Sequence, residues 1–189
     1  YVQGSRPDSK FFDKFDHMQI PGGFYTGIHN WIANMASRYT PTRTPLFVEK
    51  QVRTFYQHNV QGVNWDGRPY VYGLEGPVVY IYGRMFDDPP NMQAKDLMYE
   101  FCDAAFGKAA PDMVRFYNRL YHAIELYSLY LGTHGDGWTY TDIYGRGHKS
   151  IQDPFRMLGF LYTPKLLAAL EKDLVRADKD RAKDKVEAR

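Results

Sequence analysis

The chain has 189 residues, of which 44% are hydrophobic and 24% are charged, a balance typical of a soluble globular domain with a sizeable core. A formal net charge of +2 gives no basis for nucleic-acid binding through bulk electrostatics, and the single cysteine excludes an internal disulfide framework. No apolar run approaches the roughly 20 residues that a membrane-spanning helix needs. The sixteen tyrosines and twelve phenylalanines indicate either a large aromatic core or a surface that stacks on ring-shaped ligands.

The first half of the chain alternates predicted strands and helices. Residues 24–31 (FYTGIHNW) are predicted to form a buried strand with a polar exit, and residues 45–59 an amphipathic helix. A second strand is predicted at 60–65 (VQGVNW), followed by an apolar helix at 76–86 with Pro77 in its first turn. Strand, helix, strand, helix is the repeating unit of a parallel α/β sheet or barrel.

The second half is predicted to be helical. Apolar residues recur with helical spacing in residues 94–107 and 111–132, each closed by a glycine, and in residues 163–180, which begin with a Thr-Pro pair. The pattern changes near residue 90, at a step rich in aspartate and proline. We therefore predict two parts, an α/β part in residues 1–90 and a helical part in residues 91–189.

Polar and aromatic residues follow both predicted strands, at the end where a parallel barrel meets its ligands. Such mixtures recognise sugars, because indole faces stack on sugar rings while carboxylates and amides pair with hydroxyls. The predicted substrate-binding residues are Tyr25, His29, Asn30, Trp31, Asn64 and Trp65. Asp66, at the second strand exit, and Glu75, just before the next helix, are the candidate catalytic carboxylates.

Each of these residues also has a structural interpretation, which the sequence leaves open. Trp65 could plug the end of a sheet or barrel, and His29 could be a buried structural histidine. Asp66 is followed by glycine, an ordinary turn pair. Glu75 could be a carboxylate at a helix N-terminus, where the helix dipole favours negative charge.

Other chemistries have less support. The sequence contains no Walker loop and no dinucleotide fingerprint, and no histidine and carboxylate pair has the helical spacing of a zinc site. Cys102 lies in a predicted core helix and is expected to pack rather than react. We therefore expect no cofactor and no metal.

One long segment resembles a known family. The pattern consists of Gly62-Val63, Tyr80 to Phe86, Asp88-Pro89, Glu100-Phe101, and Phe106-Gly107 followed by Ala109-Ala110, Met113 and Phe116-Tyr117. It is similar to the end of domain-of-unknown-function family 4838, bacterial glycoside-hydrolase-like proteins related to α-glucuronidases and hexosaminidases. The similarity covers roughly residues 20 to 130 and is most specific from Gly76 onward.

The resemblance implies an α/β fold, with the last strands of a TIM-type barrel in residues 1–90 and a helical C-terminal region after them. It also implies a secreted or periplasmic location. The chain begins abruptly and is too short for a whole barrel, so we expect it to be a piece of a longer protein whose earlier strands carry the acid/base carboxylate. Trp65 and Asp66 could match a Trp and a nearby acid that hold substrate hydroxyls in the hexosaminidase-like relatives, although here the two residues are adjacent.

The expected function is that of a C-terminal portion of a carbohydrate-active protein, a glycoside hydrolase acting on poly- or oligosaccharides. The expected partner is a carbohydrate substrate, with no nucleic acid and no membrane. Two alternatives stay open: a non-catalytic carbohydrate-binding protein, and a structural or assembly module in which the aromatic helix at 111–132 packs against a partner helix.

Overall fold

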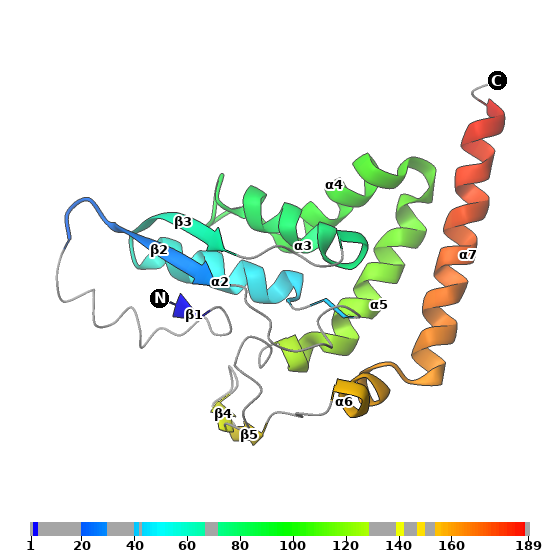
Figure 1. Cartoon of the computed structure of the whole chain (residues 1–189). Helices are drawn as coiled ribbons and strands as arrows, with labels where there is room; N and C mark the ends of the chain where they lie inside the picture. The colour runs from blue at the N-terminus through cyan, green and yellow to red at the C-terminus, as the bar shows by residue number, and fades with distance from the viewer. Residues whose placement is uncertain are drawn as a thin grey trace.

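The chain forms a small parallel sheet and a set of packed helices (Figure 1). The computed structural model describes residues 2–3, 20–29, 40–41, 43–66, 72–128, 139–141, 147–149 and 154–187. In these ranges three strands pair in parallel in the order β1-β2-β3, and two short strands form an antiparallel pair. The strands are β1 (Val2–Gln3), β2 (Phe24–His29), β3 (Val60–Asp66), β4 (Thr139–Thr141) and β5 (Gly147–Lys149).

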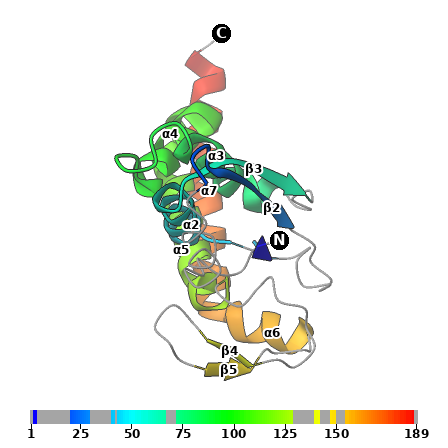
Figure 2. The same ribbon diagram turned by 90° about the vertical axis from the view of Figure 1, so that its left-hand side faces the viewer.

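The helices contain most of the described residues. They are α2 (Pro45–Gln57), α3 (Tyr72–Met85), α4 (Ala94–Phe106), the 3-10 helix η2 (Gly107–Ala109), α5 (Ala110–Ser128), α6 (Pro154–Leu161) and α7 (Pro164–Glu187). Figure 2 shows β2 and β3 towards one side of the molecule and α2, α4 and α5 towards the other. In Figure 1, α7 runs alongside α5 and ends near the C-terminus of the chain.

The predicted fold class, the last strands of a TIM-type barrel followed by a helical region, is wrong for the described part of the chain, which is mostly helical. The structure has the expected order β2, α2, β3, α3, but β1 contributes only two residues to the sheet. A barrel closes with eight strands. One βαβ unit fits an open sheet as well as a barrel, so the strand-helix order alone could not establish closure.

Helix α2 begins and ends at residues suited to those positions. The Thr44 hydroxyl accepts a hydrogen bond of 3.2 Å from the backbone N–H of Phe47, and Pro45 occupies the first helical position. The helix ends at Gln57, and Asn59 adopts a φ of 56°, a left-handed conformation that asparagine tolerates. The chain thereby turns directly into β3.

One hydrophobic core runs through the helices and continues across residue 90, where the sequence predicted a division. It contains Phe47 and Phe55 of α2, Ile81 of α3, Met98 of α4 and Ile124 of α5, all almost completely buried. Cys102 is buried in the same core as expected, and burial raises the pKa of its thiol to about 11. Each side of residue 90 thus supplies part of the same apolar interior.

Helix α3 begins at Tyr72, before the predicted start at Gly76, so Pro77 lies inside the helix rather than in its first turn. Proline has no N–H and cannot donate to the carbonyl four residues earlier, which here belongs to Gly73. The Tyr117 hydroxyl of α5 donates a hydrogen bond of 2.8 Å to the Gly73 carbonyl oxygen. A side chain from a neighbouring helix therefore occupies the acceptor that Pro77 leaves open.

Helix α5 packs against α4 and α7 of the same chain. Its buried residues include Phe116 and Tyr117, whose rings lie edge to face with centroids 5.2 Å apart. On the α7 side, the Arg119 Nε atom lies 2.7 Å from the carboxylate of Asp173, which is only 1% exposed. Helices of the same chain thus pack against α5, and assembly with a partner protein stays a prediction.

Candidate functional site

The sheet places the carboxyl ends of the two predicted strands next to each other. Strands β2 and β3 are parallel and in register, with Gly27 opposite Asn64 and His29 opposite Asp66. The two carboxyl ends therefore meet at one edge, as the prediction of a shared site requires. Asn30 and Trp31 lie outside the described residues, as do the side chains of His29, Trp65 and Asp66.

Tyr25 lies on an open face of this sheet. Its side chain is 81% exposed, and a β-carbon built on Gly62 would lie 2.4 Å from the Cδ1 and Cε1 atoms of the ring. The edge of the ring therefore occupies the place that a β-carbon at position 62 would take, which glycine leaves open. Asn64, two residues further along β3, is also exposed. The open face of the sheet thus presents an aromatic ring and an amide.

The opposite face of the same strands turns towards the core. Thr26 is buried, and Phe24, Val60 and Val63 are partly buried against the core residues. The alternation of the pleat thus separates a covered face from an exposed one. Phe24 pairs with Val60 but Tyr25 pairs with Gly62, so the pairing shifts by one residue at this point. The shift allows Val60 and Val63 to lie on the same covered face.

The candidate carboxylate Glu75 lies in the interior rather than on the open face. Glu75 is 5% exposed in the first turn of α3, and Arg43, just before α2, is 4% exposed. Burial lowers the pKa of the Arg43 guanidinium from its ordinary value, while Tyr82 and Glu75 act in the opposite direction. The Arg43 guanidinium also lies 5.9 Å from the centre of the Phe47 ring. Glu75 therefore belongs to a buried charged group between α2 and α3.

Two tyrosine hydroxyls from α5 hold the start of α3 from its other side. Tyr117 donates to the Gly73 carbonyl, and Tyr121 donates to the Leu74 carbonyl at 2.7 Å. Burial is the main cause that raises the pKa of Tyr117, to about 12, and the pKa of Tyr121 also lies above its usual value for that reason. Both phenols therefore keep their protons near neutral pH and act as hydrogen-bond donors.

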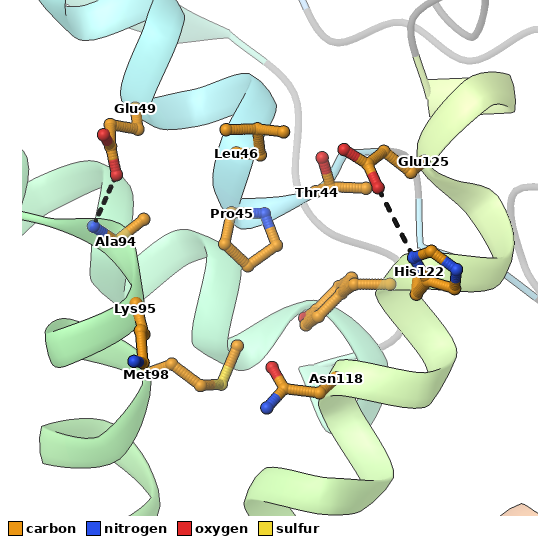
Figure 3. Close-up of a pocket in the computed structure, with 11 residues that line it drawn as sticks. Thr44, Pro45, Leu46, Glu49, Ala94, Lys95, Met98, Asn118, His122 and Glu125 are labelled. Carbon is orange, nitrogen blue, oxygen red and sulfur yellow. Dashed lines mark hydrogen bonds and ion pairs between the residues drawn. The ribbon is translucent and has the colours of Figure 1, made fainter.

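A separate pocket of about 290 Å³ lies where α2, α4 and α5 meet (Figure 3). Figure 3 shows the Glu49 carboxylate turned towards Ala94 and the Glu125 carboxylate turned towards His122. The Ala94 N–H donates to Glu49 at 2.8 Å, and His122 lies 3.6 Å from Glu125. The lining residues are Thr44, Pro45, Leu46, Glu49, Ala94, Lys95, Met98, Asn118, Tyr121, His122 and Glu125.

The sequence prediction did not include this pocket, because its residues come from three helices and follow no local motif. Glu49 stabilises the start of α4 in this pocket. The Gln93 side chain makes no cap at the start of α4, and Glu49 takes over that task while also pairing with Arg53 at 3.1 Å. The carboxylate thus neutralises the positive end of the α4 dipole.

The described ranges contain no group of three or more histidine, cysteine, aspartate or glutamate residues that could hold a metal ion. Among the helices of those ranges, none is both long enough and apolar enough to cross a bilayer. The candidate ligand site is the open sheet face with Tyr25. Tyr25 is the second residue of β2 (Phe24–His29), so it lies near the amino end of the strand and not at the carboxyl end, where the sequence predicted it.

Comparison of the chain with protein-family models, curated proteins and solved structures finds no match. The similarity to family 4838 consequently rests on the sequence pattern alone, and the activity that it implies stays a prediction.

Proposed function

We propose that this chain binds carbohydrate on the open face of the sheet formed by β2 and β3, as part of a carbohydrate-active protein. The observation that carries the proposal is the Tyr25 ring, which is 81% exposed and has the edge formed by Cδ1 and Cε1 against Gly62. An aromatic ring fixed in this way offers its free face to the C–H groups of a sugar ring at little cost in side-chain entropy. The exposed Asn64 amide can donate to and accept from sugar hydroxyls.

The carboxyl ends of the two strands lie further along the same sheet, beyond Gly27 and Asn64. The His29 and Asp66 backbones are paired at the end of the sheet, and Asn30 and Trp31 follow His29 in the sequence. Their residue types are those that hold sugar hydroxyls and stack on sugar rings. In the proposed site these residues bind the substrate, with Asp66 as the carboxylate of the set.

Hydrolysis of a glycosidic bond by the usual route needs two carboxylates on either side of that bond. Glu75 is buried and interacts electrostatically with the buried Arg43, so we assign it no proton transfer. We therefore propose only binding for the residues of this chain, which is compatible with hydrolysis by a longer protein that contains it.

Calorimetric titration of the full chain with a panel of neutral, amino-sugar and uronic-acid oligosaccharides tests the proposal. Tyr25→Ala is expected to weaken the binding of any glycan that binds by about three- to tenfold, because the stacking contribution of one aromatic ring is lost. Tyr56→Ala is the matched control, because Tyr56 is also largely exposed but lies on α2. No binding to any glycan, or equal losses in the two variants, would contradict the proposal.

A second assay separates binding from catalysis. The same protein is incubated with aryl-glycosides and aryl-uronides, and release of the aryl group is followed with and without Asp66→Asn. Binding without turnover supports the binding-protein alternative for this chain. Turnover that Asp66→Asn abolishes would instead establish hydrolysis and make Asp66 one of its carboxylates.

A further inference from the structure

The pocket where α2, α4 and α5 meet has the size and the walls of a small-molecule site. Its volume of about 290 Å³ lies at the lower end of the range for ligand pockets in proteins. Three of the side chains that line it, those of Ala94, Met98 and Tyr121, are almost completely buried. The pocket thus has an apolar inner wall, on which a small organic molecule can bury apolar surface.

This inner wall favours an aromatic ring. The Tyr121 hydroxyl donates to the Leu74 carbonyl, which fixes the orientation of the Tyr121 ring. Aromatic rings attract one another in offset and edge-to-face arrangements. The thioether of Met98 also makes favourable contacts with aromatic rings. A ligand ring in the pocket would therefore contact both side chains without breaking a hydrogen bond of the protein.

Two carboxylates line the pocket, and each already has a partner in the protein. Glu49 accepts from the Ala94 N–H at 2.8 Å and pairs with Arg53 at 3.1 Å. Glu125 lies 3.6 Å from His122. Figure 3 shows Glu49 turned towards Ala94 and Glu125 turned towards His122. A cationic group on a ligand would compete with these partners, so the two carboxylates do not favour a cationic ligand.

Lys95 and Asn118 supply the polar groups that a ligand can use. Both residues are exposed and line the pocket. Among the residues that the structure describes, the Lys95 ammonium has no ion-pair partner and the Asn118 amide has no hydrogen-bond partner. Figure 3 shows the Asn118 amide and the end of the Met98 side chain directed towards the same space between α4 and α5. An ammonium and an amide N–H both donate to a carboxylate, and the charged pair adds electrostatic attraction.

We propose that this pocket binds a small aromatic carboxylate, with its ring against Met98 and Tyr121 and its carboxylate at Lys95 and Asn118. No residue of the parallel sheet lines the pocket, so the inference does not depend on carbohydrate binding at Tyr25. The lining residues come from three helices, so a bound ligand connects α2, α4 and α5 and stabilises the folded chain.

Three probes with the same bicyclic ring and different charges test the choice of ligand: 2-naphthoate, 2-naphthamide and 2-naphthylmethylammonium. The full chain is labelled with carbon-13 at the methyl groups of its seven methionines, and Met98→Leu assigns the Met98 resonance. On titration near neutral pH, 2-naphthoate is expected to shift the Met98 resonance in a saturable way, because the bound ring lies against that methyl group. It is expected to bind about fivefold more tightly than 2-naphthamide, and the ammonium probe is expected to bind most weakly.

Two variants change the charge at the pocket and leave the buried wall intact. Lys95→Met is expected to weaken 2-naphthoate about fivefold and to change the affinity of 2-naphthamide less than about twofold. Lys165→Met is the matched control, because Lys165 is the exposed second residue of α7 just as Lys95 is the exposed second residue of α4. It is expected to bind all three probes as the wild type does. Asn118→Asp, which adds a negative charge without changing the shape, is expected to reverse the preference from the carboxylate to the ammonium probe.

Each possible result either supports or overturns the inference. Equal affinities for the three probes, or losses of the same size in Lys95→Met and Lys165→Met, would overturn the assignment of a carboxylate ligand. An unchanged Met98 resonance with every probe would overturn the pocket as a site for aromatic ligands. Neither result bears on the sheet face, where glycan binding is measured separately with Tyr25→Ala.

Discussion

The helices and the parallel sheet of this chain bury their aromatic side chains very differently. Phe55 of α2 is 1% exposed within the helical core, whereas Tyr25 of β2 is 81% exposed on the sheet. Parallel sheets are normally covered on both faces by helices. Here the described helices cover one face, and the other presents an aromatic ring, two glycines and an amide. The difference indicates that the helical side contains most of the core, while the sheet face with Tyr25 is the one on which we propose that a ligand binds.

The largest expected effect tests this division directly. Phe55→Ala is expected to destabilise the chain by about 3–5 kcal/mol, because it leaves a cavity in the core. Tyr25→Ala removes an aromatic ring of similar size and is expected to cost at most about 1 kcal/mol, the range of a single cross-strand contact. Chemical denaturation followed by circular dichroism measures both. Equal losses of stability in the two variants would mean that Tyr25 contributes to the core as much as Phe55 does. The helices and the sheet face would then not differ in their contribution to the fold.

The next effect concerns the attachment of α7 to the helical side. Asp173→Asn is expected to cost about 2 kcal/mol, because the partly exposed Arg115 and Arg119 lose the buried carboxylate that holds them. Hydrogen exchange should report faster opening in α7 and unchanged protection in β2 and β3. Leu174→Ala, on an exposed position of α7, provides the control and should change stability by less than about 0.5 kcal/mol. A uniform loss of protection would show that the sheet depends on α7.

The elements of the fold could be predicted where the pattern was local. Helical periodicity placed α2, α4 and α5 close to their observed ranges, and the Thr44-Pro45 pair marked the start of α2. The apolar run before Asn64 was predicted as a strand and is part of β3. Each of these predictions concerns a single helix or strand, so it depends only on residues that are close together in the sequence.

The arrangement of the elements could not be predicted in the same way. Barrel closure depends on how many strands pair, and one βαβ unit does not contain that number. The burial of Glu75 depends on Arg43 and on helix α5, which are distant in the sequence. The Tyr25 contact with Gly62 depends on the register between two strands. Tyr25 and Glu75 were both predicted as site residues, but only their three-dimensional neighbours show that Tyr25 is exposed and Glu75 is buried.

The smallest of the three effects concerns how the helical side holds the helix that follows the sheet. Tyr117→Phe is expected to cost about 1–2 kcal/mol, because the Gly73 carbonyl loses its donor and Pro77 cannot replace it. Tyr121→Phe should cost less, because the Leu74 carbonyl can still accept from the N–H of Val78. In a Pro77→Ala background the restored N–H can occupy the Gly73 carbonyl, so Tyr117→Phe should then cost about 1 kcal/mol less than in the wild type. A double-mutant cycle by urea denaturation measures this coupling. Additive losses would mean that the contribution of the Tyr117 hydroxyl does not depend on the missing N–H of Pro77, and that the hydroxyl does not compensate for the proline at the start of α3.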